Sequence, residues 1–491
     1  MDEQLLYSAK QLRELDQQAC AALGIDDYAL MCRAGEAAFH HLRGVWPQAK
    51  TILVLCGSGN NGGDGYVLAR LAHEAGMTSI LCAAGRKPGV DTAAGQARAG
   101  FLKTGGTIDE FDEALCKQAD VIVDGLLGTG LDRPIRDDSA ALIQAVNESA
   151  VPVLALDIPS GLSADTGCVL GCAIKAEQTV SFIGLKQGLF TADAADYTGV
   201  LHFARLDVPE TAYQTVSPTA RVLNETLLAD SLPPRRYNTH KGTYGHVLAV
   251  GGAPGMSGAI RLTTEAALRA GVGKVTLATQ AAHAPFANLT RPELMVAAVE
   301  SATDLEPLLQ QATVLALGPG LGTTGWGKQL WPTGLASDKP LVLDADGLNL
   351  LAQNPQQRGR WILTPHPGEA ARLLGSSTTE IQNDRFAAAN ALAERYQAIV
   401  VLKGSGTIIA NPDGTPSFVC PYGNPGMASA GMGDVLTGII AAFIAQGLPL
   451  LEAACAGVLA HALAGDRAAD GHPRGLLASD VLAQLRYAVN P

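Results

Sequence analysis

Short apolar runs alternate with stretches of helical periodicity along the whole chain. Buried parallel strands have this appearance, and many of them end in glycine or an acid. In the first half the predicted strands are 51–56, 79–83, 121–123, 151–156 and 179–183. Helical periodicity follows at 66–75 and 140–147, and residues 8–41 predict two helices ahead of the first strand. The alternation predicts a doubly wound α/β fold with a parallel sheet.

A second series of apolar runs predicts a second α/β domain. Its expected strands are 246–250, 274–278, 314–317, 341–343, 361–363 and 399–402. Between the two series, prolines and polar residues interrupt the periodicity over 208–234. A chain of 491 residues is also too long for one ordinary core. We therefore expect a boundary near residue 220, with domains at 1–218 and 219–491.

The composition argues against several classes of protein. A formal charge of −12 without a basic cluster argues against a nucleic-acid surface. The longest strongly apolar helix, around 436–445, is too short to cross a bilayer, and residues 1–4 show no secretory signal. Nine scattered cysteines without a CxxC pair favour reduced thiols. We expect a cytoplasmic enzyme that acts on small molecules, with neither a membrane nor a nucleic acid as partner.

The most informative motif lies late in the chain. Residues 424–434 read Asn-Pro-Gly-Met-Ala-Ser-Ala-Gly-Met-Gly-Asp and lead into an apolar helical run, 435–445. Free N–H groups at a helix start, with little side chain in the way, can hold phosphate oxygens. Asp434 would repel a phosphate in a simple binding site, so it suits a base that deprotonates an attacking hydroxyl. The alternative is an N-cap aspartate on a buried helix.

Other strand ends in the second half carry glycines and polar residues, and ligands of open α/β sheets bind beyond such ends. These segments are Gly251–Ala259, Gly318–Gly322, Asp344–Asn349 and Pro365–Glu369. Lys403 follows the last predicted strand and could reach a polyphosphate, although the sequence is not a Walker A loop. The residues after it, Gly404, Ser405, Gly406 and Thr407, could hold phosphate oxygens. Tight turns and a surface hairpin are the alternatives.

The first half has its own glycine-rich segment. Residues 57–65 read Gly-Ser-Gly-Asn-Asn-Gly-Gly-Asp-Gly and fit G-x-G-x-x-G, but no acid follows the second strand as a dinucleotide site requires. Asp124 and Asp157 end two further predicted strands. Together with the side-chain oxygens of 60–64, these acids could coordinate a hard cation of low charge. Alternatively, Asp64 and Asp157 cap helices or turns.

The motifs of the second half resemble the ADP/ATP-dependent NAD(P)H-hydrate dehydratases of the ribokinase-like superfamily, over about 223–489. The resemblance rests on Lys241–Gly245, His-Pro-Gly-Glu at 366–369, Val-Leu-Lys-Gly at 401–404 and the 424–434 motif. It implies that Asp434 assists transfer of phosphate from ADP, bound with Mg²⁺, to the ring hydroxyl of a hydrated nicotinamide, leaving AMP and phosphate. It also implies that Gly431 and Gly433 stabilise the transferred group, that Gly433 and Lys403–Thr407 hold the nucleotide, and that Ala259, Gly322, His366 and Asp434 contact the hydrate.

The first half resembles the YjeF N-terminal domain, the NAD(P)H-hydrate epimerases, over about 5–206. Asn-Asn-Gly-Gly-Asp-Gly at 60–65, Asp-Ile-Pro-Ser-Gly at 157–161 and Ala29–Gly35 carry the likeness, although Cys32 stands where many relatives have Glu. The resemblance implies K⁺ at Asn61, Asp124 and Ser160, and Asp157 as acid or base. The implied hydrate contacts are Asn60, Asn61, Gly62, Gly63, Asp64, Gly128, Thr129, Gly130, Leu131, Asp132, Arg133, Pro134 and Asp157.

Together the two resemblances imply a bifunctional enzyme that repairs NADH and NADPH hydrates. The expected fold is a Rossmann-like αβα domain followed by a ribokinase-like αβα domain, and a homo-oligomer is expected. Epimerisation by water loss or by ring opening stays open. Two rival functions remain: a vitamin kinase with a regulatory Rossmann-like domain, and a nucleotide sensor without turnover.

Overall fold

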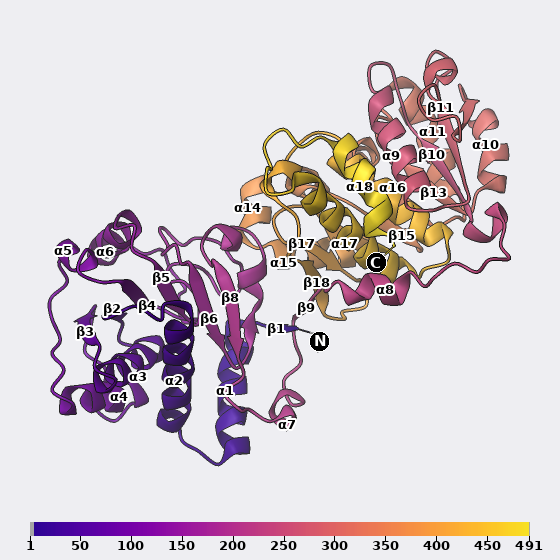
Figure 1. Ribbon diagram of the computed structural model, residues 1–491. Helices are drawn as coiled ribbons and strands as arrows, with labels where there is room; N and C mark the ends of the chain where they lie inside the picture. The colour runs from indigo at the N-terminus through magenta and orange to yellow at the C-terminus, as the bar shows by residue number, and fades with distance from the viewer. Residues whose placement is uncertain (1–3, 491) are drawn as a thin grey trace. The chain divides into compact units, whose positions relative to one another are not determined.

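The computed structural model describes residues 4–490, and the chain divides into two compact units between Arg221 and Val222 (Figure 1). Each unit has a mainly parallel sheet covered by helices, as the alternating pattern predicts. The fold class is therefore confirmed. No helix in the described part of the chain combines the length and apolar character that a membrane span needs.

The first unit contains a six-stranded, all-parallel sheet in the order β3-β2-β4-β5-β6-β8. Its strands are β2 (Thr51–Cys56), β3 (Thr78–Ala83), β4 (Val121–Gly125), β5 (Val153–Leu156), β6 (Gln178–Phe182) and β8 (Val200–Ala204). Its helices are α1 (Ala9–Leu23), α2 (Asp27–Val45), α3 (Asn60–Glu74), α4 (Ala93–Lys103), α5 (Glu113–Cys116), α6 (Asp137–Glu148) and α7 (Glu210–Tyr213).

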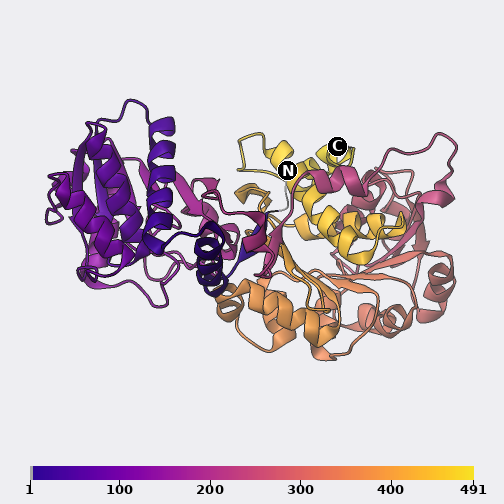
Figure 2. The ribbon, with the colours of Figure 1, turned by 90° about the horizontal axis from the view of Figure 1, so that it is seen from below.

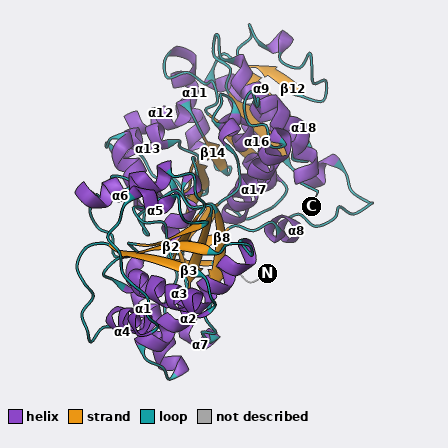
Figure 3. Ribbon diagram, turned by 60° about the vertical axis from the view of Figure 1, so that its left-hand side comes forward, coloured by secondary structure: helices purple, strands orange, loops and turns teal. Residues whose placement is uncertain are grey.

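Alternate residues of the central strand β2 face two separate cores. Ile52 and Val54 pack in the cluster with α1 to α4, whereas Leu53 and Leu55 pack in the cluster with α5 and α6. Figure 3 shows these two groups of helices on opposite sides of the strands of this unit. Successive side chains of a strand point to opposite faces of the sheet, and helices cover both faces. The first unit is therefore a three-layer αβα arrangement.

Three short strands outside the six-stranded sheet also pair with one another. β1 (Leu5–Tyr7) pairs in parallel with β7 (Leu185–Lys186) and antiparallel with β9 (Ala220–Val222). These strands of two or three residues are too short for a period of two to be recognised in the sequence, so the sequence did not predict them.

The second unit has the strand order β12-β11-β10-β13-β14-β15-β16-β17-β18, parallel from β12 to β16 and antiparallel afterwards. The strands are β10 (His246–Val250), β11 (Lys274–Thr279), β12 (Met295–Ala298), β13 (Val314–Leu317), β14 (Leu341–Leu343), β15 (Trp361–Leu363), β16 (Ile399–Leu402), β17 (Thr407–Ala410) and β18 (Ser417–Cys420). The predicted strands of this half are confirmed, but β12, β17 and β18 were not predicted.

Helices cover both faces of this sheet, as Figure 2 shows for the yellow C-terminal helices and the orange helices. The helices are α8 (Thr226–Ser231), α9 (Ser257–Arg269), α10 (Ala302–Gln311), α11 (Gly325–Ala336), α12 (Asp346–Gln353), α13 (Pro367–Leu374), α14 (Thr378–Asn383), α15 (Arg385–Tyr396), α16 (Met432–Ala445), α17 (Leu450–Ala469) and α18 (Ala478–Ala488). The main core joins α9, α16, α17 and α18 to one face of the strands.

Two predicted helix starts need correction. The helix predicted at 66–75 begins at Asn60, so the glycines of the 57–65 motif lie partly in the first turn of α3. The helix predicted at 435–445 begins at Met432, with Gly431 as its N-cap. The N-cap alternative for Asp434 is therefore wrong, and Asp434 lies within the first helical turn. In both cases the glycines at the helix start have low helix propensity, so the sequence did not predict the first turn. Tertiary packing stabilises that turn in the fold.

Candidate active sites

The start of α16 places Asp434 beside the backbone N–H groups of the first helical turn. Gly431 precedes the helix with φ 92°, a left-handed conformation that glycine adopts without steric cost. A Cβ at this position would also lie 2.6 Å from Leu262 Cδ1, so the turn needs glycine for space as well. The first N–H groups of a helix have no partner within the helix. This turn can therefore receive an anion next to the Asp434 carboxylate.

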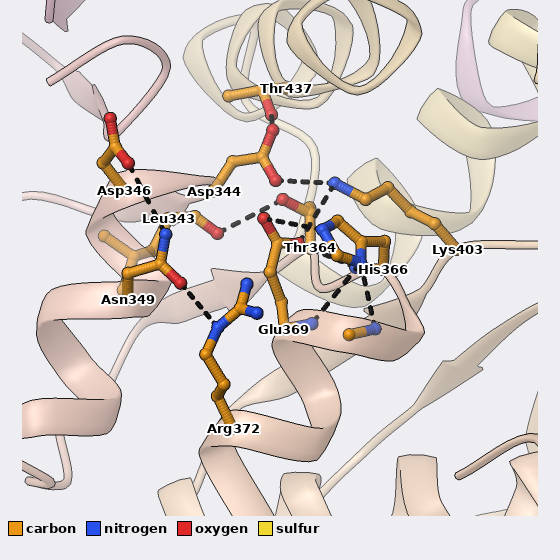
Figure 4. A network of polar contacts seen from close by, with 11 residues as sticks. Leu343, Asp344, Asp346, Asn349, Thr364, His366, Glu369, Arg372, Lys403 and Thr437 are labelled. Atoms are coloured by element: carbon orange, nitrogen blue, oxygen red, sulfur yellow. Dashed lines mark hydrogen bonds and ion pairs between the residues drawn. The ribbon is translucent and has the colours of Figure 1, made fainter. Parts of the chain in front are cut away.

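A buried ion pair lies directly beneath this turn. Lys403 follows β16, and its Nζ donates to Asp344 Oδ1 at 2.7 Å, while Thr437 Oγ1 donates to Asp344 Oδ2 at 2.9 Å (Figure 4). Glu369 Oε2 lies 3.8 Å from the same ammonium. Burial alone would raise the pKa of Asp344, but the charge of Lys403 and these hydrogen bonds hold it below its usual value. Burial would likewise lower the pKa of Lys403, and the two carboxylates raise it.

Gly433 keeps this ammonium close to the helix start. A Cβ on Gly433 would lie 3.0 Å from Lys403 Nζ and 3.5 Å from Asp344 Oδ2. The predicted reach of Lys403 towards a polyphosphate therefore has to be shared with Asp344, because one donor of the ammonium is already engaged. The positive charge nevertheless lies at the place where the helix N-terminus would receive a phosphate.

The Asp434 carboxyl group has a pKa raised to near neutral pH. Burial raises its pKa most, Asp344 raises it further, and Lys403 only partly opposes them, so the pKa of Asp434 is about 7. A general base is most effective when its pKa is close to the working pH. The geometry of the turn and the raised pKa of its carboxyl group suit a base, and the role of Asp434 stays a prediction.

Three further strand ends meet near this site. His366 caps α13, where its Nδ1 accepts from Gly368 N at 3.0 Å, and Glu369 Oε2 accepts from His366 N at 2.8 Å. After β13, Gly322 N donates to Asp346 Oδ2 at 2.8 Å. The start of α9 contacts the same loop, because a Cβ on Gly320 would lie 3.4 Å from that of Ala259. The structure thus links Gly322 and Ala259 through one loop, and links His366 to Lys403 through Glu369.

Arg385 shapes the loop after β16, and sequence reasoning missed it. Its side chain is buried in α15, and one terminal nitrogen donates to the carbonyls of Leu402, Lys403 and Gly406 at 3.2, 3.3 and 3.4 Å. Thr407 Oγ1 also donates to Gly404 O at 3.1 Å. A buried arginine that engages backbone carbonyls fixes the shape of the 403–407 segment. Charged residues are almost never fully buried unless they are paired in this way.

The first unit contains a cavity of about 450 Å³ at the carboxyl ends of its strands. The predicted contact residues that line it are Asn60, Asn61, Asp64, Gly128, Thr129, Gly130, Leu131 and Asp157. The remaining predicted contacts, Gly62, Gly63, Asp132, Arg133 and Pro134, are not among its lining residues. Gly62 and Gly63 have packing roles instead, since Cβ atoms there would lie 2.0 Å from Gly57 O and 2.4 Å from Met31 Sδ.

Asp157 is held in this cavity by a lysine that the sequence did not reveal. Lys186 Nζ forms an ion pair with Asp157 Oδ1 and also donates to Ser181 Oγ at 2.9 Å and Gly184 O at 3.1 Å. The Lys186 side chain is 2% exposed. Asp157 itself has φ 66°, an uncommon conformation for a residue with a side chain, and such residues concentrate at functional sites. In the sequence, a lysine inside the otherwise largely apolar segment 180–190 could have indicated the importance of Lys186.

A network of oxygens adjoins the same cavity through Asn61 and Leu127, which line it. Ser160 N and Oγ donate to the Asp124 carboxylate at 2.7 and 2.6 Å, and Leu127 N donates to Ser160 Oγ at 2.8 Å. Asn61 Nδ2 donates to Leu127 O at 2.8 Å, while Asn61 Oδ1 is buried without a hydrogen-bond partner. Burial raises the pKa of Asp124 to about 6 despite these hydrogen bonds. The structure thus brings together the three side chains predicted for K⁺, with one amide oxygen unsatisfied.

Comparison with known proteins accounts for both halves of the chain. The profile of the YjeF-related protein N-terminus matches residues 27–188, and that of NAD(P)H-hydrate dehydratase matches 247–486. The bifunctional NAD(P)H-hydrate repair enzyme of Coxiella burnetii is 50% identical over 488 residues, covering 99% of this chain and 100% of that protein. The Escherichia coli K12 enzyme of the same name is 45% identical, over 99% of this chain and 94% of that protein. The chain belongs to this family.

Solved structures support the fold of the second unit of this family member. A ribokinase-like superfamily protein from Enterococcus faecalis V583 is 29% identical with a TM-score of 0.52, covering 55% of this chain and 95% of that one. A hypothetical protein from Streptococcus mutans is 28% identical with a TM-score of 0.51, covering 55% and 98%. Both resemblances recognised in the sequence, one for each half, are confirmed by the family assignment.

Proposed function

We propose that this protein repairs hydrated NADH and NADPH through two activities in one chain: the first unit interconverts the R and S hydrates, and the second dehydrates the S form at the expense of ADP. The observation that carries the proposal is Asp434, a carboxylate with a pKa of about 7 in the first turn of α16. Neither a vitamin kinase nor a sensor explains why the same chain also holds a carboxylate-lined cavity in its first unit.

The dehydratase reaction follows from the poor leaving ability of hydroxide. Asp434 accepts the proton of the ring hydroxyl while that oxygen attacks the terminal phosphorus of ADP and AMP departs. The lone pair of the ring nitrogen then expels the phosphate and restores the reduced nicotinamide after loss of a proton. Backbone N–H groups at the start of α16 stabilise the charge on the transferred group. ADP is expected to arrive with Mg²⁺, as phosphoryl transfer requires.

We assign the remaining residues of the second unit by their positions. Lys403, the 404–407 segment and Gly433 hold the nucleotide, and the buried Arg385 supports this role because it fixes the carbonyls of the loop. Ala259, Gly322 and His366 contact the hydrate. In this arrangement the ring hydroxyl of the hydrate lies next to the nucleotide and to Asp434.

The kcat/KM of the dehydratase should fall at acid pH as Asp434 becomes protonated. A base has to be deprotonated to act, so kcat/KM is expected to fall about tenfold per pH unit below a pH of about 7. The same raised pKa means that the folded state binds more protons than the unfolded chain, so this group makes the protein less stable as pH rises from about 4 to 7. Steady-state kinetics with S hydrate and ADP from pH 5.5 to 9 measure this fall. A flat profile would contradict the role of Asp434 as base.

For the first unit we propose that the hydrate enters the cavity beside Asp157, which serves as an acid or base. The cavity residues Asn60, Asn61, Asp64 and the loop from Gly128 support this placement because they face the same space. We also propose that K⁺ binds among Asn61, Asp124 and Ser160. The unsatisfied Asn61 Oδ1 supports this fit, since an amide, a carboxylate and a hydroxyl oxygen suit a hard cation. The ion would supply a fixed positive charge beside the cavity.

Removal of K⁺ should slow epimerisation without affecting dehydration. Exchange of K⁺ for choline at constant ionic strength is expected to lower the epimerisation rate by about tenfold, and Asn61→Ala should weaken K⁺ binding by roughly 10- to 100-fold. K⁺ titrations that follow the melting temperature give a readout independent of activity. Gln144→Ala, which removes an exposed amide from α6, is the matched control. A wild-type protein indifferent to K⁺ in both measurements would refute the site.

One assay tests the function as a whole. Purified protein with ADP and a mixture of both hydrates should restore the near-ultraviolet absorbance of NADH completely, whereas a dehydratase without an epimerase would stop once the S form is used up. Parallel assays with ATP identify the preferred donor. No recovery with either nucleotide would favour the vitamin-kinase or sensor alternatives.

The partners we propose are the hydrates and ADP, in a homo-oligomer that works in the cytoplasm, where NADH and NADPH are damaged. The nine cysteines are scattered along the sequence without a CxxC pair, which supports a reducing compartment. Sedimentation equilibrium of the purified chain tests the oligomeric state.

A further inference from the structure

Helix α1 brings a third carboxyl group to the cavity of the first unit. Asp16 lines this cavity together with Asp64, Asp157 and Lys186, although it lies ahead of the segment 27–188 that the YjeF-related profile matches. The side chain is partly buried, and within residues 4–490 no hydrogen bond or ion pair engages its carboxyl group. None of the motifs considered above includes it.

The environments of Asp16 and Asp157 differ in a way that suits opposite roles. Asp157 has the buried ammonium of Lys186 as a direct partner, whereas Asp16 has no cation in contact. Burial raises the pKa of Asp16 to about 6, nearby Asp157 adds to the rise, and Lys186 opposes it only at a distance. The other charged groups facing Asp16 are Asp27 on α2, Asp64 on α3, and Arg13 on its own helix, with the Cys20 thiol one turn further along. Pairs of acids in unlike surroundings commonly divide acid and base work between them.

The cavity itself points to a ligand. Asn61, 7% exposed, is one of the residues that line the cavity and has a buried amide oxygen without a hydrogen-bond partner, and the buried side chain of Lys186 lines the same cavity. A cluster that served only to stabilise the fold would leave neither an unsatisfied oxygen nor an open volume of about 450 Å³.

We propose that Asp16 is a catalytic residue of the epimerase and acts as the proton-transfer partner of Asp157; this inference rests on the function proposed above. Asp16 gives its proton to the ring hydroxyl, the C–O bond breaks with its electron pair on oxygen, and water departs. The lone pair of the ring nitrogen forms a C=N bond. Water then adds to the same carbon from the other face, the C=N pair returns to nitrogen, and Asp157 accepts the proton released. Proton exchange with solvent resets the two carboxyl groups.

Epimerisation is measured separately by omitting ADP, since no dehydration can then occur, and by following the separated R and S hydrates by chromatography against a blank without enzyme. Asp16→Asn is expected to lower the epimerisation kcat by about a hundredfold or more, with a smaller change in KM. Dehydration of S hydrate by the same protein should stay within twofold, and unchanged hydrogen exchange in peptides covering 178–190 shows that the first unit is folded. Glu14→Gln removes an exposed charge from the same helix and should leave both rates unchanged.

The pH profile distinguishes a catalytic from a structural role. Because the active form carries its proton on Asp16, wild-type kcat/KM for epimerisation should fall about tenfold per pH unit above a pH of about 6. The residual activity of Asp16→Asn should lack this limb, and Asp16→Glu should restore it with part of the rate. A wild-type profile without the limb, or an Asp16→Asn protein within threefold of wild type, would overturn the proposal. If wild type itself does not interconvert the hydrates, it is the proposed function that fails.

Discussion

Replacement of Asp434 by asparagine is expected to lower the dehydratase turnover by roughly 10²- to 10⁴-fold, the usual contribution of a positioned general base. Asparagine has the size of aspartate but cannot accept the proton of the attacking hydroxyl. Its amide carries no charge, so repulsion with the phosphates of ADP disappears, and the nucleotide should bind as well as to wild type or better. A large loss in kcat with an unchanged or lower KM for ADP is therefore the expected signature.

The bifunctional chain supplies the controls for this variant. Epimerisation without ADP should proceed at the wild-type rate, because it takes place in the other unit. Glu452→Gln removes a carboxylate from the first turn of α17, a helix start outside the site, and should leave dehydration unchanged. An Asp434→Asn protein that dehydrates S hydrate at more than a tenth of the wild-type rate would exclude Asp434 as the base.

The sequence revealed the sheets and the two families because those features are local. Apolar runs match β10, β13 and β14 residue by residue, since both faces of these strands are buried. The motif glycines stand where backbone approaches backbone, for example Gly62 against Gly57. The strands that went unpredicted are short or, like β12 with its exposed Met295, lie at an edge where burial imposes no pattern.

The partners of the charged residues could not be predicted, because they are distant in the sequence. Lys403 and Asp344 are 59 positions apart, and Lys186 and Asp157 are 29 apart. The lysine at 403 was recognised from its position after a strand and was expected to reach a polyphosphate, yet the structure gives it a carboxylate partner. Asp434 and Asp157 illustrate the same limit. The sequence places Asp434 near a helix start and Asp157 at a strand end. Only the fold shows that Asp157 has a direct cation partner, whereas Asp434 has none among the described residues.

The second large effect is expected from Lys186→Met, which removes the cation from the cavity of the first unit. Loss of one member of a buried ion pair leaves the other uncompensated, and the expected destabilisation of this unit is about 3–5 kcal/mol. The Lys186 side chain is 2% exposed and also donates to Ser181 Oγ and Gly184 O. Water therefore cannot take the place of its ammonium group unless the surrounding residues rearrange. Epimerisation should fall by at least a hundredfold, because Asp157 loses both its partner and its fixed position.

A double variant separates the energetic from the chemical part of this effect. Lys186→Met combined with Asp157→Asn leaves neither member of the pair charged, so it should recover most of the stability lost by Lys186→Met alone while remaining inactive as an epimerase. Hydrogen exchange of peptides covering 178–190 reports the stability of this unit without interference from the other. Dehydration of S hydrate should be the same in wild type and in both variants. If Lys186→Met exchanges as slowly as wild type and still interconverts the hydrates, the buried pair neither stabilises the unit nor positions Asp157.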